Sequence, residues 1–243
     1  AALACHGLFE ADSPLAVPAS ALENPALSSV LVQSAIGDFE CAWGNYVAAV
    51  GALRDEFSGS ATAIQENYDR RLPGTVLNQF GDCAVTTQPS TNIYGPLQKA
   101  RFQADDTYVR MQAWTDASVP APGKTVYLAT LAAYAGYVYT VFGEGFCQST
   151  FDAGPPLTPR QVLLIAEQRF TAAVGLAQTA GNAELANFAN VGLARVSLDL
   201  GKLPQAAAAA KLVAANYVRN ATYSSDAFRR RNQVNVFNYA SLF

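Results

Sequence analysis

Small and aromatic residues recur through residues 124–216 at the spacing that paired helices require. Gly136, Tyr139 and Gly143 give the first helix of a pair a small residue, an aromatic residue and a turn glycine. Phe170, with alanines four residues before it and three after it, gives the second helix a matching face. Small residues let two helix backbones approach closely, and aromatic side chains fill the space between them. The pattern therefore predicts helices packed in pairs.

A further helix pair is predicted after residue 180. Its turn, Leu-Gly-Lys-Leu-Pro-Gln-Ala at residues 200–206, stands where tetratricopeptide repeats carry a Leu-Gly-x-Tyr-x-x-Ala sequence. The expected fold class is therefore all-α, with tetratricopeptide-like helix-pair repeats, long irregular loops and an arm at each end of the chain.

Helical periodicity and capping residues give the expected order of elements. Thr158 and Gln161 can form a capping box around Pro159 at the first helical position. On the second predicted helix, Arg101 and Asp105 are expected to face solvent. The predicted helices are residues 20–57, 97–115, 125–142, 158–180, 183–200 and 204–217.

Three parts of the chain follow from this order. Residues 1–19 are an N-terminal arm, and residues 20–217 are the helical repeat domain. Residues 218–243 are a C-terminal arm or the start of a second half, and their alternating apolar end fits a strand or a docking arm. Residues 62–93 are a long irregular connection, which in a compact domain is usually functional or stapled.

Residues 125–142 contain no charged side chain over 18 residues, long enough to raise the question of a membrane span. They include four tyrosines and three threonines, and a polar Gly-Glu-Gly turn follows them. The inner helix of a repeat is covered on both faces, which explains apolar residues all round. We therefore expect a core helix.

Composition excludes several classes of function. Hydrophobic residues make up 51% of the chain and charged residues 14%, so the chain can bury a substantial core. A net charge of −3 and a pI near 5.2 give no electrostatic basis for binding nucleic acid. His6 is the single histidine, which argues against His-based catalysis and against a His-rich metal site. No nucleophile motif, P-loop or complete dinucleotide fingerprint occurs, so neither an enzyme nor a cofactor is expected.

The four cysteines are Cys5, Cys41, Cys83 and Cys147. An even count at wide spacing fits two disulfides in an exported protein, with three possible pairings, while four buried thiols are the alternative. Cys5 follows a short apolar tract that looks like the tail of a lipoprotein signal. It is therefore either a lipidation site or a disulfide partner, and both predict a location outside the cytoplasm.

Four segments together resemble the SusD/RagB family of outer-membrane nutrient-uptake lipoproteins. They are residues 20–40, 137–147 (YVYTVFGEGFC), 157–174 (LTPRQVLLIAEQRFTAAV) and 190–213 (NVGLARVSLDLGKLPQAAAAAKLV). The resemblance implies a SusD-like α-α superhelix on the outer leaflet, capping a TonB-dependent transporter and holding a saccharide or peptide before import. In that family the repeat helices usually dock the transporter, and irregular loops hold the ligand through aromatic faces and polar side chains.

Aromatic residues are the candidate ligand contacts. Tyr68 and Tyr94 lie in or beside the irregular residues 62–93, where contact with a ligand is plausible. Trp43 and Trp114 lie within amphipathic helices, where aromatic residues normally serve the core. A second hypothesis is structural: a shortened SusD-like repeat domain that binds copies of itself in an extracellular assembly or filament.

Overall fold

A computed structural model describes residues 19–54, 56, 83, 93–224, 231, 232 and 234. Within these residues the chain is helical, which confirms the all-α class, and the one β-bridge joins Ser149 and Leu157. Three short 3-10 helices are η1 (Ala19–Glu23), η2 (Pro25–Leu27) and η3 (Asp116–Ser118). The α-helices are α1 (Ser28–Leu53), α4 (Tyr94–Ala113), α5 (Lys124–Gly145), α6 (Pro159–Thr179), α7 (Ala183–Asp199) and α8 (Leu203–Lys211).

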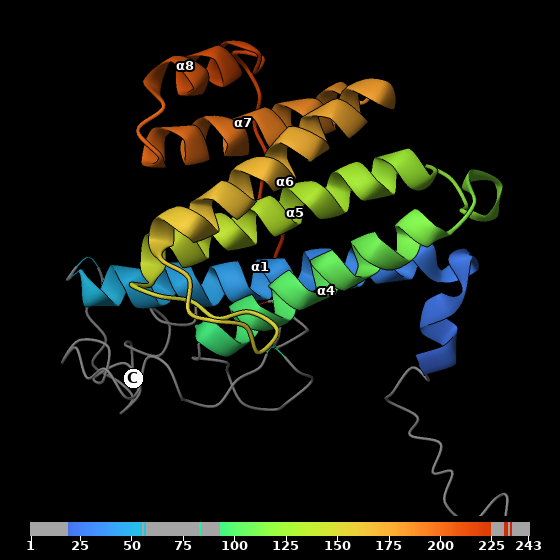
Figure 1. The fold of residues 1–243 in the computed structure, drawn as a ribbon, viewed down its shortest axis with the longest axis horizontal. Coiled ribbons are helices and arrows are strands. Elements are labelled where there is room, and N and C mark those ends of the chain that lie inside the picture. The colour runs from blue at the N-terminus through green and yellow to red at the C-terminus, as the bar shows by residue number, and fades with distance from the viewer. Residues whose placement is uncertain are drawn as a thin grey trace, which may run out of the picture.

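The helices pack in chain order, each against the next, from α1 to α8. In addition α5 contacts both α1 and α7, so these three helices form one layer. Figure 1 shows α4 and α6 in front of that layer, with α8 at the upper end of the stack. The arrangement places α5 at the centre, where it contacts α1, α4, α6 and α7.

The central helix α5 is long and apolar enough to cross a membrane by length and composition, and it is the one helix of the described residues that passes this test. Yet 83% of its most apolar 18-residue stretch is buried inside the protein. Leu131, Val138 and Phe142 are among its fully buried side chains. The prediction of a core helix is confirmed.

Two glycines determine how closely α5 and α7 approach α6. Gly136 on α5 and Gly192 on α7 both face the ring of Phe170, which is fully buried on α6. A Cβ atom would lie 2.8 Å from that ring at Gly136 and 2.1 Å from it at Gly192. Glycine therefore lets one aromatic side chain fill the junction of three helices, where the spacing predicts close packing of one pair.

Helix ends follow the predicted capping at some points and differ at others. Thr158 and Gln161 form the predicted capping box on α6. The first helix begins at Ser28, after a 3-10 helix capped by Asn24, rather than near residue 20. The last helix ends at Lys211 rather than residue 217. This helix buries only one side chain, so little packing would be gained by extending it. Instead, the backbone N–H of Ala214 donates to Asn187 of α7.

The prediction that Arg101 and Asp105 face solvent is wrong. The side chain of Arg101 is 6% exposed, and its guanidinium donates to both carboxylate oxygens of Asp152 at 2.7 and 2.8 Å. Asp105 accepts a hydrogen bond from Tyr139 at 2.6 Å and pairs with Arg169 at 2.7 Å. The reason is tertiary: the loop after α5 folds back over Arg101, while side chains of α5 and α6 contact Asp105.

One predicted disulfide is present, between Cys41 on α1 and Cys83. It fixes Cys83, within the long irregular connection, to the helical core, and it fits a protein outside the reducing cytoplasm. Cys147 is exposed and forms no disulfide among the described residues. Cys5 lies outside the described residues, so its lipidation or pairing stays a prediction.

Candidate functional site

After α8 the chain runs back across the α1–α5–α7 layer, and residues 214–222 of this segment are here called the strap. Figure 1 shows it in red, passing behind α6 and α5 toward α1. At one end Asn187 of α7 accepts the backbone N–H of Ala214 at 3.1 Å. At the other end Thr222 donates its hydroxyl to Glu40 of α1 at 2.8 Å. The strap therefore joins the two outer helices of the layer.

Arg219 anchors the middle of the strap. Its guanidinium lies 4.0 Å from the ring centroid of Phe188, donates to the Tyr134 hydroxyl at 2.9 Å, and pairs with Glu184. Burial lowers the pKa of Arg219, but the contacts with Tyr134 and Glu184 outweigh it and the net pKa is raised. The guanidinium therefore stays charged and held on both α5 and α7.

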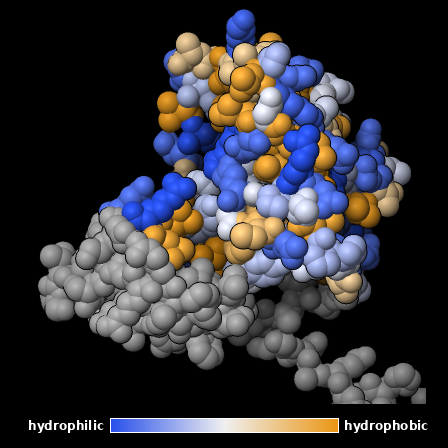
Figure 2. Space-filling view, turned by 60° about the vertical axis from the view of Figure 1, so that its left-hand side comes forward, coloured by the Kyte–Doolittle hydropathy of each residue, from blue (hydrophilic) through white to orange (hydrophobic). Residues whose placement is uncertain are grey.

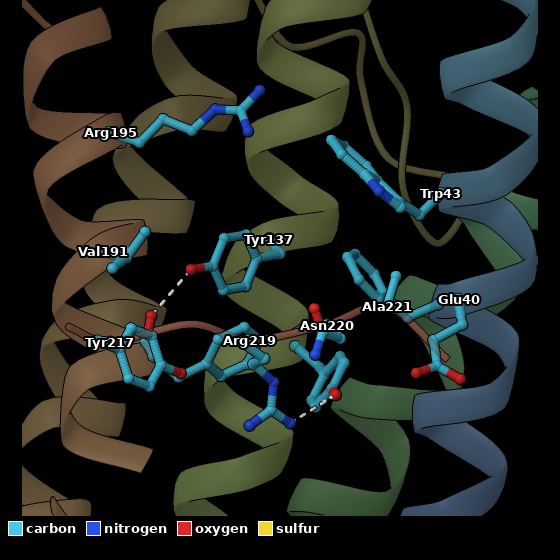
Figure 3. Close-up of a pocket in the computed structure, with 12 residues that line it drawn as sticks. Glu40, Trp43, Tyr137, Val191, Arg195, Tyr217, Arg219, Asn220 and Ala221 are labelled. Atoms are coloured by element: carbon cyan, nitrogen blue, oxygen red, sulfur yellow. Dashed lines mark hydrogen bonds between the residues drawn. The ribbon is translucent and has the colours of Figure 1, made fainter. Parts of the chain in front are cut away.

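Two pockets lie on either side of Arg219. The aromatic pocket, of about 310 Å³, lies between α1 and α7 with α5 as its floor (Figure 3). The polar pocket, of about 330 Å³, lies toward the N-terminal ends of the same three helices. The aromatic pocket is lined by Phe39, Glu40, Trp43, Tyr134, Tyr137, Phe188, Val191, Arg195, Tyr217, Arg219, Asn220 and Ala221. The polar pocket is lined by Ser29, Val32, Gln33, Ile36, Ala121, Pro122, Val126, Tyr127, Thr130, Asn182, Glu184, Leu185 and Arg219.

Aromatic rings from three helices build the aromatic pocket. Trp43 of α1 stacks on Tyr46 with ring centroids 6.0 Å apart. Tyr137 of α5 stacks on Phe188 of α7 at 4.6 Å and donates its hydroxyl to the Phe188 carbonyl at 2.8 Å. Burial raises the pKa of Tyr137 well above its ordinary value. The phenol is therefore neutral, and its hydrogen bond to the Phe188 carbonyl fixes the ring as an aromatic surface.

Arg195 closes the end of the aromatic pocket farthest from Arg219, where Figure 3 shows it across from Trp43. Its guanidinium lies 5.9 Å from the Trp43 ring and donates to both carboxylate oxygens of Glu144, at 2.6 and 2.5 Å. Burial, and then a hydrogen bond with Glu144, raise the pKa of Asp199 to about 6. A cation and two carboxyl groups thus form a compact cluster at this end.

The charged groups of the aromatic pocket are paired within the protein. Arg195 pairs with Glu144, Arg219 pairs with Glu184, and Glu40 accepts from Thr222. The twelve lining residues include no serine, threonine, cysteine, histidine or lysine that would act as a nucleophile or a histidine-type base. The site can bind an uncharged molecule with apolar faces.

The predicted ligand residues lie elsewhere. Tyr94 packs on Phe142 and Phe146, and its hydroxyl contacts the backbone of Thr150 at 3.3 and 3.4 Å. It lines neither pocket, so its proposed contact with a ligand stays a prediction. Tyr68 lies outside the described residues.

The two tryptophans divide between core and pocket. Trp114 is half-buried against the core, as predicted. Trp43 also packs on the core, but it lines the aromatic pocket as well. The sequence holds one signal for this: Glu40, one of two charged residues of α1, lies three residues before Trp43 and lines the pocket with it. A charge inside an apolar helix marks a place where the helix meets something polar.

No group of three or more His, Cys, Asp or Glu side chains in the described residues is arranged to hold a metal ion. Comparisons with protein-family models, with curated proteins and with solved structures find no match to this chain.

Proposed function

We propose that this chain is a non-enzymatic cell-surface binding protein of the SusD/RagB kind, which holds a ligand for a TonB-dependent transporter. The observation that carries the proposal is the aromatic pocket, because Trp43 and Tyr137 face a cavity bounded by paired charges. The order of helices supports it too. Successive helices from α1 to α8 pack against one another, as helices of a tetratricopeptide-like stack would.

A neutral linear saccharide fits the chemistry of the aromatic pocket best. The apolar face of a sugar ring can stack on the indole of Trp43 or the phenol of Tyr137, since aromatic faces bind C–H edges favourably. Its hydroxyl groups can hydrogen-bond the polar rim, where Asn220 and the Arg195–Glu144 pair lie. A charged ligand would have to break one of the internal ion pairs, which disfavours it.

Binding can be followed by the fluorescence of Trp43. In a Trp114→Phe variant Trp43 is the sole tryptophan, and malto-oligosaccharides from the disaccharide to the octasaccharide are titrated into it. We expect a saturable change in emission, and about a tenfold loss of affinity by calorimetry in Trp43→Ala. Uncharged peptides form a parallel series. Binding of peptides alone would replace the saccharide, and binding of neither series would contradict the proposal.

The cell-surface location has its own test. Mass spectrometry of the native protein from outer-membrane fractions is expected to show a lipid on Cys5 and co-purification with a barrel transporter. An unmodified Cys5 and a protein recovered only from the soluble exported fraction would remove the transporter from the proposal.

A second candidate function, a structural subunit that binds copies of itself, rests on the end of the stack. Leu198, Leu203 and Leu212 are 58%, 62% and 63% exposed on and beside α8. Figure 2 shows apolar residues among hydrophilic ones at the top of the molecule, where Figure 1 places α8. An uncovered terminal repeat can pair with another stack.

Light scattering tests this self-association. A particle mass that rises with protein concentration, and that Leu203→Glu lowers, would support the structural subunit over the monomeric binding protein.

A further inference from the structure

Arg219 is the only residue shared by the linings of the aromatic pocket and the polar pocket. The same helices continue past it on both sides. On α1 the lining passes from Ile36 in the polar pocket to Phe39 in the aromatic pocket, and on α7 from Leu185 to Phe188. The two cavities therefore lie one after the other along the α1–α5–α7 layer, and the side chain of Arg219 lies at their boundary.

The contacts of Arg219 make this boundary firm. The guanidinium is stacked on Phe188, and its two ends are taken by Glu184 of α7 and by the Tyr134 hydroxyl of α5. A planar fork that is stacked and paired at once has few alternative positions. The strap is also held independently at Ala214 and Thr222, so its course does not depend on Arg219 alone.

We propose that Arg219 sets the length of ligand that the site accepts, by closing one end of the aromatic pocket and separating it from the polar pocket. This inference rests on the proposed binding function. A short ligand fills the aromatic pocket and stops at the guanidinium. Without that side chain, a longer ligand continues into the polar pocket, where Gln33, Thr130 and Asn182 offer amide and hydroxyl groups. Since the two pockets are similar in volume, the accessible space roughly doubles.

The test compares how affinity depends on ligand length in four forms of the full chain. Malto-oligosaccharides from the disaccharide to the octasaccharide are titrated by calorimetry into the wild type, Arg219→Ala, Arg219→Lys and Arg110→Ala. Arg110 is the matched control, because it also bridges two acids, Asp106 and Glu23, but on α4 and away from both pockets. In the wild type, affinity should stop increasing at a short oligomer. In Arg219→Ala it should keep increasing, until the octasaccharide binds about tenfold more tightly than to the wild type.

Arg219→Lys is a second variant for the case in which Arg219→Ala does not fold. It keeps the charge but cannot stack as a planar fork, so a partial extension of the length dependence is expected. If the wild type binds and the folded variants show a parallel length dependence, Arg219 only stabilises the strap and the inference is overturned. If the wild type and all variants bind no oligomer, the proposed saccharide site is overturned and the inference falls with it.

Discussion

Arg101 and Arg219 each fix an irregular segment to the helical core, but in different surroundings. Arg101 lies on α4 and holds the loop after α5 through Asp152, while the ring of Phe151 lies 5.3 Å from its guanidinium. Arg219 lies on an irregular segment and is itself held by helices, through Phe188 and Glu184. Both guanidinium groups are stacked on aromatic rings and paired with acids.

The difference lies in what adjoins each arginine. Arg101 lines neither pocket, whereas Arg219 lines both. Asp105 and Tyr139 fill the remaining side of Arg101, so that region is closed packing. A contact inside a densely packed region, like that of Arg101, stabilises the fold. A similar contact between two cavities, like that of Arg219, also limits which ligands can enter them. Substitutions that change the stability of the protein without changing how affinity depends on ligand length, or the reverse, therefore test the comparison of Arg101 with Arg219.

Gly192→Ala should have the largest effect, because it disrupts the packing of α7, which holds Arg219, against α6. The new Cβ would lie 2.1 Å from the ring of Phe170, which is fully buried. Overpacking of this kind costs about 3 kcal/mol. Urea unfolding measures the loss. The control is Gly175→Ala on α6, where a Cβ meets no atom within 4 Å and a gain of about 0.5 kcal/mol is expected. Equal stability in the two variants would contradict the close packing of α7 on α6.

Asp152→Asn should destabilise by about 2 kcal/mol, because it leaves the buried Arg101 without its bidentate carboxylate. The loss is smaller than for a fully enclosed pair, since the Asp152 side chain is 64% exposed and Asp105 remains 3.9 Å from the guanidinium. Asparagine is chosen because position 152 has a φ of 51°, which asparagine tolerates.

The control for Asp152→Asn is Asp116→Asn. Asp116 also faces a cation, Lys124 at 3.7 Å, but it is 85% exposed, so its substitution should change the free energy of unfolding by less than about 0.5 kcal/mol. Neither substitution should alter ligand affinity or its dependence on length. A change in binding caused by Asp152→Asn would end the distinction between the two arginines.

Arg219→Ala should cost only about 1 kcal/mol, although it removes a stacked and paired guanidinium. Its acidic partner Glu184 is 58% exposed, so no buried charge is left unpaired, and the strap keeps its contacts at both ends. Hydrogen exchange should increase in residues 217–222 and remain unchanged in α4. A loss of stability as large as that of Asp152→Asn would show that Arg219 is a core element and not a boundary between pockets.

The sequence predicts the helical core well because the relevant signals are local. Periodicity identifies α4, α5, α6 and α7, and the capping box at Thr158 marks the start of α6 to the residue. The spacing also predicts Gly136 and Phe170 as a small residue and an aromatic residue of one helix pair, whereas the contact of Gly192 with Phe170 is seen only in the structure. These features depend on residues within a few turns of one another, so a pattern in the sequence contains them.

The functional region is predicted poorly because its contacts are distant. Thr222 binds Glu40 across 182 residues, and Asp152 reaches Arg101 across 51. No periodicity reports such pairs, so the sequence places Arg101 in solvent and divides the strap between a helix and an arm. It assigns Trp43 to the core for the same reason: the helix that carries Trp43 does not reveal the pocket that α7 and the strap complete.

The smallest expected effect is a pH dependence at the end of the aromatic pocket farthest from Arg219. Burial and Glu144 raise the pKa of Asp199 to about 6 in the folded protein, from an ordinary value of 3.8. Between those values the folded state binds more protons than the unfolded state, so this carboxyl group makes stability fall as pH rises through that window. Above pH 6 the destabilisation caused by the charged Asp199 is fully present.

Asp199→Asn should therefore stabilise the protein slightly at pH 7 to 8 and have little effect near pH 4. Urea unfolding across this range measures the difference between the variant and the wild type. A variant that is destabilised at pH 8 would show that the charged Asp199 supports Arg195 rather than opposing Glu144.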